Sequence, residues 1–207
     1  MDSVIMDMAN ATSVAWETNW ETAFRRARDE RRVVLIKVEK HDHCIGCELL
    51  DEQVFPDPDV AEVLSRRFIC LRLDYTSPDA RALRVLWLPT LIVMDRMQVE
   101  HYRSVNSLPP ADLLDVLAVG EAQARIREAR YGVAEQLLRS ALGRRADASM
   151  RPELLYWLGI SVYWVGHEDH DARDHVWDRL VVEHPDSIWA HRTPQFLTGG
   201  RPARPAL

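Results

Sequence analysis

One stretch decides the fold of this chain, and it reads Val33-Val34-Leu35-Ile36-Lys37-Val38-Glu39-Lys40-His41-Asp42-His43-Cys44-Ile45-Gly46-Cys47-Glu48-Leu49-Leu50. It opens with an apolar run of the kind that forms a buried strand, which we expect over residues 32–39. It closes with residues that favour a helix. Two cysteines with the spacing C-x-x-C therefore lie where a strand gives way to a helix.

This placement suits the chemistry of sulfur. A C-x-x-C pair at a helix start can close a disulfide across one turn, and the unpaired backbone N–H groups there stabilise a thiolate. Since the thiolate is the nucleophile of thiol–disulfide exchange, we expect Cys44 to be the exposed nucleophile and Cys47 the resolving thiol. A protonated His43 would lower the pKa of Cys44, and Glu48 would act against it.

Composition narrows the classes of protein that fit. The chain has 207 residues, 47% of them apolar, which is enough for one large domain or two small ones. A net charge of −6 without a sustained basic stripe argues against a nucleic-acid partner. The acidic N-terminal residues do not resemble a signal peptide, and no apolar run is long enough for a membrane span. We therefore expect a cytoplasmic protein with no membrane partner, whose third cysteine, Cys70, is a small buried hydrophobe.

Helix and strand signals alternate over the first half of the chain. Strands are expected at 32–39, 68–73, from Pro89 onward, and at 99–103, the last two as a hairpin. Helices are expected after their capping or proline signals, at Asn19, Asp57-Pro58, Ser77-Pro78 and Pro109-Pro110. This order predicts an α/β domain, a mixed sheet flanked by helices.

Beyond about residue 118 the signals become helical only. Residues 120–142 predict two helices broken near Tyr131-Gly132, and residues 155–165 and 172–183 predict a second pair. The two pairs recur at a spacing of about 39 residues, near that of tetratricopeptide units. We therefore expect a flexible N-terminus at 1–15, the sheet domain at 16–118, a small all-α region of helical hairpins at 119–193 and a disordered tail at 194–207.

The strand, the Cys44-x-x-Cys47 pair, the helix and the later Leu88-Pro89-Thr90 together resemble the thioredoxin superfamily over residues 16–118. In that family a cis-proline before an apolar strand packs against the active-site disulfide. The resemblance implies a cis Leu88–Pro89 bond and a substrate-binding role for Leu88, Pro89 and Thr90. It also implies a thiol–disulfide oxidoreductase that acts on protein disulfides and uses no cofactor.

Further residues resemble the subgroup with a tetratricopeptide-like helical extension, namely Phe55-Pro56-Asp57-Pro58-Asp59-Val60 and Asp74. That extension corresponds to residues 130–187 and implies a partner bound there. The chain departs from the family pattern at His43, where an aromatic residue is usual. The family's buried acid on the preceding strand corresponds to Glu39, or to Lys37 if the loop holds one extra residue. The sequence therefore does not decide which residue is the proton acceptor that tunes the cysteines.

Two alternatives come from other classes of protein. His41, His43, Cys44 and Cys47 are ligands that suit Zn²⁺ or Cu(I), although residues packed so closely rarely all reach one centre. A protein-interaction scaffold with a vestigial redox site is the second alternative. The tryptophans of the helical region could support a binding role of this kind, namely Trp157, Trp164, Trp177 and Trp189. The same side chains could equally fill the core of that region.

Overall fold

The computed structural model describes residues 14–145 and 147–197. These residues form two compact units. The first comprises the chain up to Ile92 together with Arg96–Gln98 and Ser104–Ala111, and the second comprises Val93–Asp95, Val99–Arg103 and the chain from Asp112. The ends of the chain, which we predict to be a flexible N-terminus and a disordered tail, lie outside the described residues at 1–13 and 198–207.

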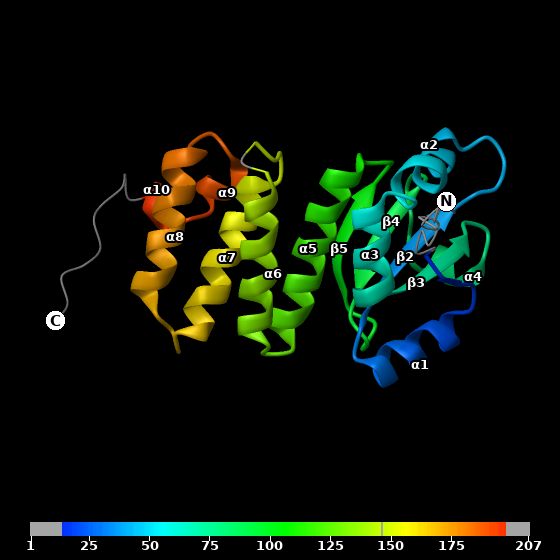
Figure 1. Cartoon of the computed structure of the whole chain (residues 1–207), viewed down its shortest axis with the longest axis horizontal. Helices are drawn as coiled ribbons and strands as arrows, with labels where there is room; N and C mark the ends of the chain where they lie inside the picture. The colour runs from blue at the N-terminus through cyan, green and yellow to red at the C-terminus, as the bar shows by residue number, and fades with distance from the viewer. Residues whose placement is uncertain (1–13, 146, 198–207) are drawn as a thin grey trace, which may run out of the picture. The chain divides into compact units, whose positions relative to one another are not determined.

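A five-stranded sheet has the order β1-β3-β2-β4-β5. Figure 1 labels β2 to β5 of this sheet. Its strands are β1 (Trp16–Glu17), β2 (Val33–Glu39), β3 (Phe68–Asp74), β4 (Thr90–Met94) and β5 (Glu100–Val105). β3 pairs in parallel with both β1 and β2. β4 and β5 are joined by residues 95–99, too short a connection for a parallel crossover, so the sheet is mixed, as the sequence predicts.

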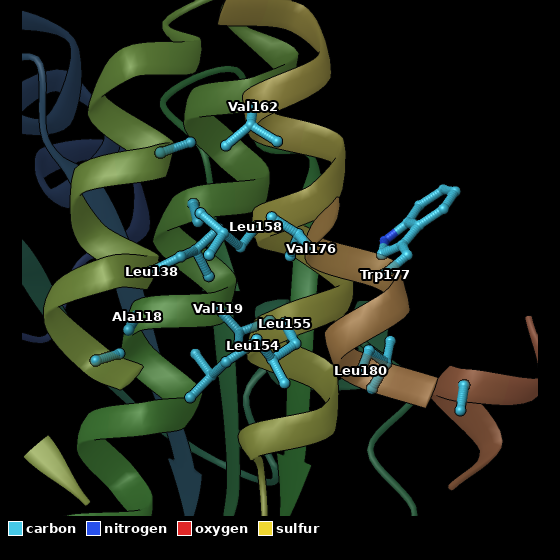
Figure 2. Close-up of a cluster of buried hydrophobic side chains, with 14 residues drawn as sticks. Ala118, Val119, Leu138, Leu154, Leu155, Leu158, Val162, Val176, Trp177 and Leu180 are labelled. Atoms are coloured by element: carbon cyan, nitrogen blue, oxygen red, sulfur yellow. The ribbon is translucent and has the colours of Figure 1, made fainter. Parts of the chain in front are cut away.

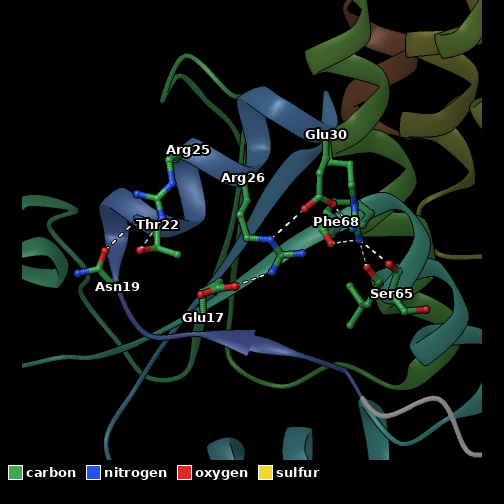
Figure 3. Close-up of polar contacts among 10 residues, drawn as sticks. Glu17, Asn19, Thr22, Arg25, Arg26, Glu30, Ser65 and Phe68 are labelled. Atoms are coloured by element: carbon green, nitrogen blue, oxygen red, sulfur yellow. Dashed lines mark hydrogen bonds and ion pairs between the residues drawn. The ribbon is translucent and has the colours of Figure 1, made fainter.

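The helices of the first unit are α1 (Trp20–Glu30), α2 (Ile45–Leu49), the π-helix η1 (Leu50–Val54), α3 (Pro58–Arg67) and α4 (Pro78–Ala82). The expected caps are present, since side chains of Asn19, Asp57 and Ser77 accept backbone N–H groups at the starts of α1, α3 and α4. Figure 3 shows the cap at Asn19 and the Arg26 guanidinium between Glu17 and Glu30. These local contacts fix where α1 begins and tie it to β1.

The second unit contains α5 (Pro110–Arg127), α6 (Tyr131–Arg144), α7 (Arg151–Val165), α8 (His170–Glu183), α9 (Ile188–His191) and α10 (Pro194–Leu197). Side chains of α5 to α9 form one apolar core, and Figure 2 shows Val119, Leu138, Leu155 and Leu158 converging in it. Three of the four tryptophans take part in this core: Trp177 is buried in it, and Trp157 and Trp189 pack against it. These three rings therefore contribute to the apolar core of the second unit.

Three sequence expectations differ from the structure. β1 is a strand that the sequence did not predict. The helix expected to end near residue 118 continues as α5 to Arg127, passing through Gly120. Pro194–Leu197, which were expected to belong to the disordered tail, form α10, and Gln195 is buried. No described residue between 120 and 190 belongs to a strand, and no helix in the described ranges has the length and hydropathy needed to span a bilayer.

Candidate active site

Cys44 and Cys47 form a disulfide between the end of β2 and the start of α2. Cys44 is the N-cap of α2: its Sγ accepts the N–H of Cys47 at 3.3 Å, and its carbonyl accepts the N–H groups of Cys47 and Glu48 at 2.9 and 3.0 Å. The N–H groups of the first turn are thus directed at Cys44. Such donors stabilise negative charge on a sulfur at this position.

Cys44 lines a groove of about 630 Å³. Four large hydrophobic side chains that line this groove are exposed, namely Ile45, Tyr75, Leu86 and Trp87, and Leu86 and Trp87 are 94% and 63% exposed. The groove is lined by Lys40, His43, Cys44, Ile45, Gly46, Leu49, Tyr75, Leu86, Trp87, Leu88, Asn106 and Ser107. Cys47 is absent from this lining. The groove therefore borders the first cysteine of the pair and not the second, although Cys44 is only 7% exposed and so is more buried than the sequence leads us to expect.

Pro89 forms a wall beside the helix that carries the cysteines. The Leu88–Pro89 peptide bond is cis. A Cβ added at Gly46 would lie 2.8 Å from Pro89 Cδ and 2.8 Å from Asn106 Oδ1, so only glycine fits here without displacing a neighbour. The N–H of Asn106 also donates to the Pro89 carbonyl at 2.8 Å. Close packing against Pro89 and Asn106 therefore requires glycine at this position between the two cysteines.

The remaining residues of the predicted substrate-binding loop lie in different surroundings. Leu88 lines the groove. Thr90 is buried at the start of β4, where its hydroxyl donates to the Trp87 carbonyl at 2.7 Å. That hydrogen bond holds the loop that presents the Trp87 side chain. His43 is exposed, has a left-handed backbone conformation and also lines the groove beside Cys44.

A cluster of four charged side chains lies behind Cys47. Lys37 and Glu39, both on β2, form an ion pair with almost no exposure. The Lys37 Nζ is 2.8 Å from Asp51 Oδ1 and 3.5 Å from the Cys47 carbonyl oxygen. Arg72 on β3 reaches the same Asp51 oxygen at 2.9 Å. Sequence reasoning named Glu39 and Lys37 but missed Asp51, which lies on η1, and Arg72, which lies opposite Lys37 in the register of β2 and β3.

Cys70 lies on β3 and is buried. Burial raises the pKa of its thiol to about 12. At neutral pH the thiolate fraction of such a group is on the order of 10⁻⁵. Cys70 therefore behaves as the small buried hydrophobe that the sequence predicts.

In the reduced protein, we expect an alkylating agent at neutral pH to modify Cys44 first, because its sulfur lines the groove and faces the donors of α2. Cys70 is expected to react only after denaturation. Peptide mass spectrometry after short exposures measures the three rates. Faster labelling of Cys47 or Cys70 than of Cys44 would contradict the assigned order.

The proposed metal ligands do not form a site in the described residues. Cys44 and Cys47 are bonded to each other, and His41 points its Nε2 to within 3.9 Å of Asp74 Oδ2. Nowhere in residues 14–145 and 147–197 do three or more His, Cys, Asp or Glu side chains gather so that they could hold a metal ion.

Residues 15–99 match the family model described as thioredoxin-like. No curated protein matches the chain. Among solved structures, a thioredoxin from Thermus thermophilus is 25% identical with a TM-score of 0.44, over 50% of this chain and 83% of that one. A putative disulphide-isomerase from Bacteroides thetaiotaomicron is 26% identical with a TM-score of 0.48, over 54% and 96%.

Proposed function

Because residues 15–99 form a thioredoxin-like domain with a C-x-x-C disulfide, we propose that this protein is a thiol–disulfide oxidoreductase acting on protein disulfides. One observation carries the proposal. Cys44 lines an open groove, while Cys47, one turn along on α2, does not line it. A reactive sulfur in front and a resolving sulfur behind are what exchange with a large disulfide substrate requires.

The proposed reaction needs only the two cysteines. The Cys44 thiolate attacks one sulfur of a substrate disulfide, and the other substrate sulfur leaves as a thiolate. Cys47 then attacks Cys44 Sγ, which releases the second substrate thiol and closes the Cys44–Cys47 disulfide. Two electrons pass to the substrate, and an external dithiol returns them to the pair. In this proposal a protonated His43 stabilises the Cys44 thiolate from the groove side.

The groove supports a protein as the substrate. Ile45, Leu86 and Trp87 place exposed apolar surface around Cys44, whereas a small hydrophilic disulfide would need no such surface. Exposed apolar side chains in one concave region are typical of binding sites for other proteins. We infer that the preferred substrate presents an apolar side chain next to its reactive disulfide.

The helices from α6 to α8 are proposed to be a tetratricopeptide-like extension that binds a partner. Consecutive helices joined by short connections are typical of such repeats. The exposed apolar residues Val182 on α8 and Ile188 on the following α9 also support this second role. A pull-down that compares the full chain with the Val182→Glu variant tests it. Equal recovery of bound protein by both would contradict a partner site at that position.

The redox proposal is tested by turnover of a protein disulfide with dithiothreitol as the electron source. The full chain should accelerate reduction of an insulin-type interchain disulfide, and the Cys44→Ser variant should not. Reduction at the uncatalysed rate by the unmodified chain, with the Cys44–Cys47 pair shown to be reduced, would reject the proposed function.

Replacing Trp87 with alanine is expected to lower kcat/KM for a protein disulfide about tenfold, equivalent to about 1.4 kcal/mol of binding in the transition state. The reason is that the indole is largely exposed beside Cys44 and is available to a substrate. A small aromatic disulfide should be reduced at an unchanged rate. Met97→Ala, at an exposed residue outside the groove, is the matched control. An equal loss for both substrates would contradict a docking role.

A further inference from the structure

A second groove adjoins the one that contains Cys44. It has a volume of about 360 Å³, and most of its lining comes from residues 80–88, which lead from α4 to Pro89. The two grooves share four lining residues, namely Tyr75, Leu86, Trp87 and Leu88. A polypeptide bound beside Cys44 therefore meets the second groove across these shared side chains.

Two arginines give the second groove its charge. Arg81 lies in the last turn of α4 and Arg84 follows the end of that helix, and both are exposed and line the groove. Arg84 has a left-handed backbone conformation with a φ of 51°, which glycine adopts at a lower cost. The chain thus carries a long cationic side chain where glycine would suit the backbone better.

The charge of the two grooves is opposite to that of the whole chain. The chain has a net charge of −6, yet the described residues that line the grooves include Lys40, Arg81 and Arg84 and no aspartate or glutamate. In the same unit, Arg26 and Arg66 lie 2.5 and 2.9 Å from carboxylate oxygens. Within the described ranges no carboxylate forms an ion pair with Arg81 or Arg84. Their charge is therefore available to a partner.

We propose that Arg81 and Arg84 form a specificity site for a substrate polypeptide that carries acidic side chains a few residues from its reactive disulfide. The inference rests on the proposed function and adds charge to the apolar character of the substrate. A guanidinium binds a carboxylate through charge-assisted hydrogen bonds that are often bidentate. Complementary charge also raises the rate at which two partners meet. An acidic segment in the second groove would thus bring its disulfide to Cys44 more often than a neutral one.

Three synthetic peptides test this charge preference. Each is a dimer linked through one cysteine, and the second and third residues on either side of that cysteine are all glutamate, all glutamine or all lysine. The kcat/KM of the full chain is measured for each peptide with dithiothreitol as the electron source. Each value is divided by the rate constant of the uncatalysed reduction, so that the intrinsic reactivity of the three disulfides cancels.

Because exposed ion pairs are weak, we expect the glutamate peptide to be preferred over the glutamine peptide about fivefold at low salt. The lysine peptide should be the poorest substrate. Sodium chloride at about 0.5 M screens exposed charges and should reduce the preference for glutamate to less than about twofold.

Charge reversal at the two arginines supplies the decisive comparison. Arg81→Glu combined with Arg84→Glu should invert the order, so that the lysine peptide becomes the best substrate. Arg25→Glu combined with Arg28→Glu is the matched control, because these arginines are also exposed, lie three residues apart on α1 and line neither groove. The control changes the net charge of the chain by the same amount and should keep the preference for glutamate.

A second variant covers the case in which the charge-reversed chain does not fold. Arg81→Gln combined with Arg84→Gln removes the two charges without replacing them, and the preference for glutamate must then disappear. An equal loss of the preference in the Arg25 and Arg28 control would overturn the inference. If the unmodified chain reduces none of the three peptides above the uncatalysed rate, the oxidoreductase function itself is wrong. If it reduces all three alike, the function stands and only the specificity site is rejected.

Discussion

Replacing Cys47 with serine is expected to stop turnover and to leave Cys44 covalently joined to the substrate. Cys44 lines the groove and makes the first attack, whereas Cys47 lies behind it on α2 and is needed to release the product. An intramolecular thiol held in place reacts far faster than a thiol from solution, so turnover should fall roughly a thousandfold or more. Non-reducing electrophoresis and mass spectrometry detect the mixed disulfide.

The other cysteines supply the controls for this experiment. Cys44→Ser should form no adduct, since the remaining Cys47 does not line the groove. Cys70→Ser should turn over as the unmodified chain does, because Cys70 is buried on β3 and its pKa is raised by burial. An adduct on Cys47 in the Cys44→Ser variant, at the rate seen on Cys44, would reverse the two roles.

Gly159→Ala is expected to cost about 3 kcal/mol of the free energy of unfolding, at the upper end of the range for overpacking. A Cβ at Gly159 on α7 would lie 2.3 Å from Nε1 and 2.6 Å from Cδ1 of Trp177 on α8. The indole cannot swing away without loss, because its N–H donates to the Tyr156 carbonyl at 3.1 Å and its ring stacks on Tyr156. The close packing of α7 and α8 therefore requires glycine at this position.

Gly143→Ala on α6 is the matched control, since a Cβ at this position would have no neighbouring atom within 4 Å. It should raise stability by about 0.5 kcal/mol, because alanine restricts the unfolded chain more than glycine does. Urea denaturation followed by tryptophan fluorescence measures both variants. A Gly159→Ala protein as stable as the unmodified chain would show that the indole has room to move.

The local features of this protein could be predicted from its sequence. Asn19, Asp57 and Ser77 begin helices because a cap and the N–H group that it accepts lie two or three residues apart. The junction of strand, Cys44 and Cys47 was predictable for the same reason, since both sulfurs and the donors of the first turn fall within four residues. The apolar run of β2 likewise predicts a buried strand from its own composition.

Features that depend on distant residues could not be predicted. β1 is only two residues long, and it exists because Trp16 and Glu17 pair with Cys70 and Leu71 of β3. The sequence predicts a separate helix from residue 120, but Gly120 lies inside α5, where a Cβ would come within 2.8 Å of Val93. A glycine that allows close approach and a glycine that ends a helix look the same in sequence.

The same distinction between local features and contacts of distant residues applies to the candidate active site. The sequence by itself singled out the two cysteines that form the disulfide, because their spacing and their place at a helix start are local. It named Glu39 and Lys37 as candidates for tuning them but could not choose between the two. Only the tertiary structure brings Asp51 from η1 and Arg72 from β3 to Lys37 and sets that lysine against Cys47. The environment of a buried charge depends on all the elements packed around it, and no local pattern records that packing.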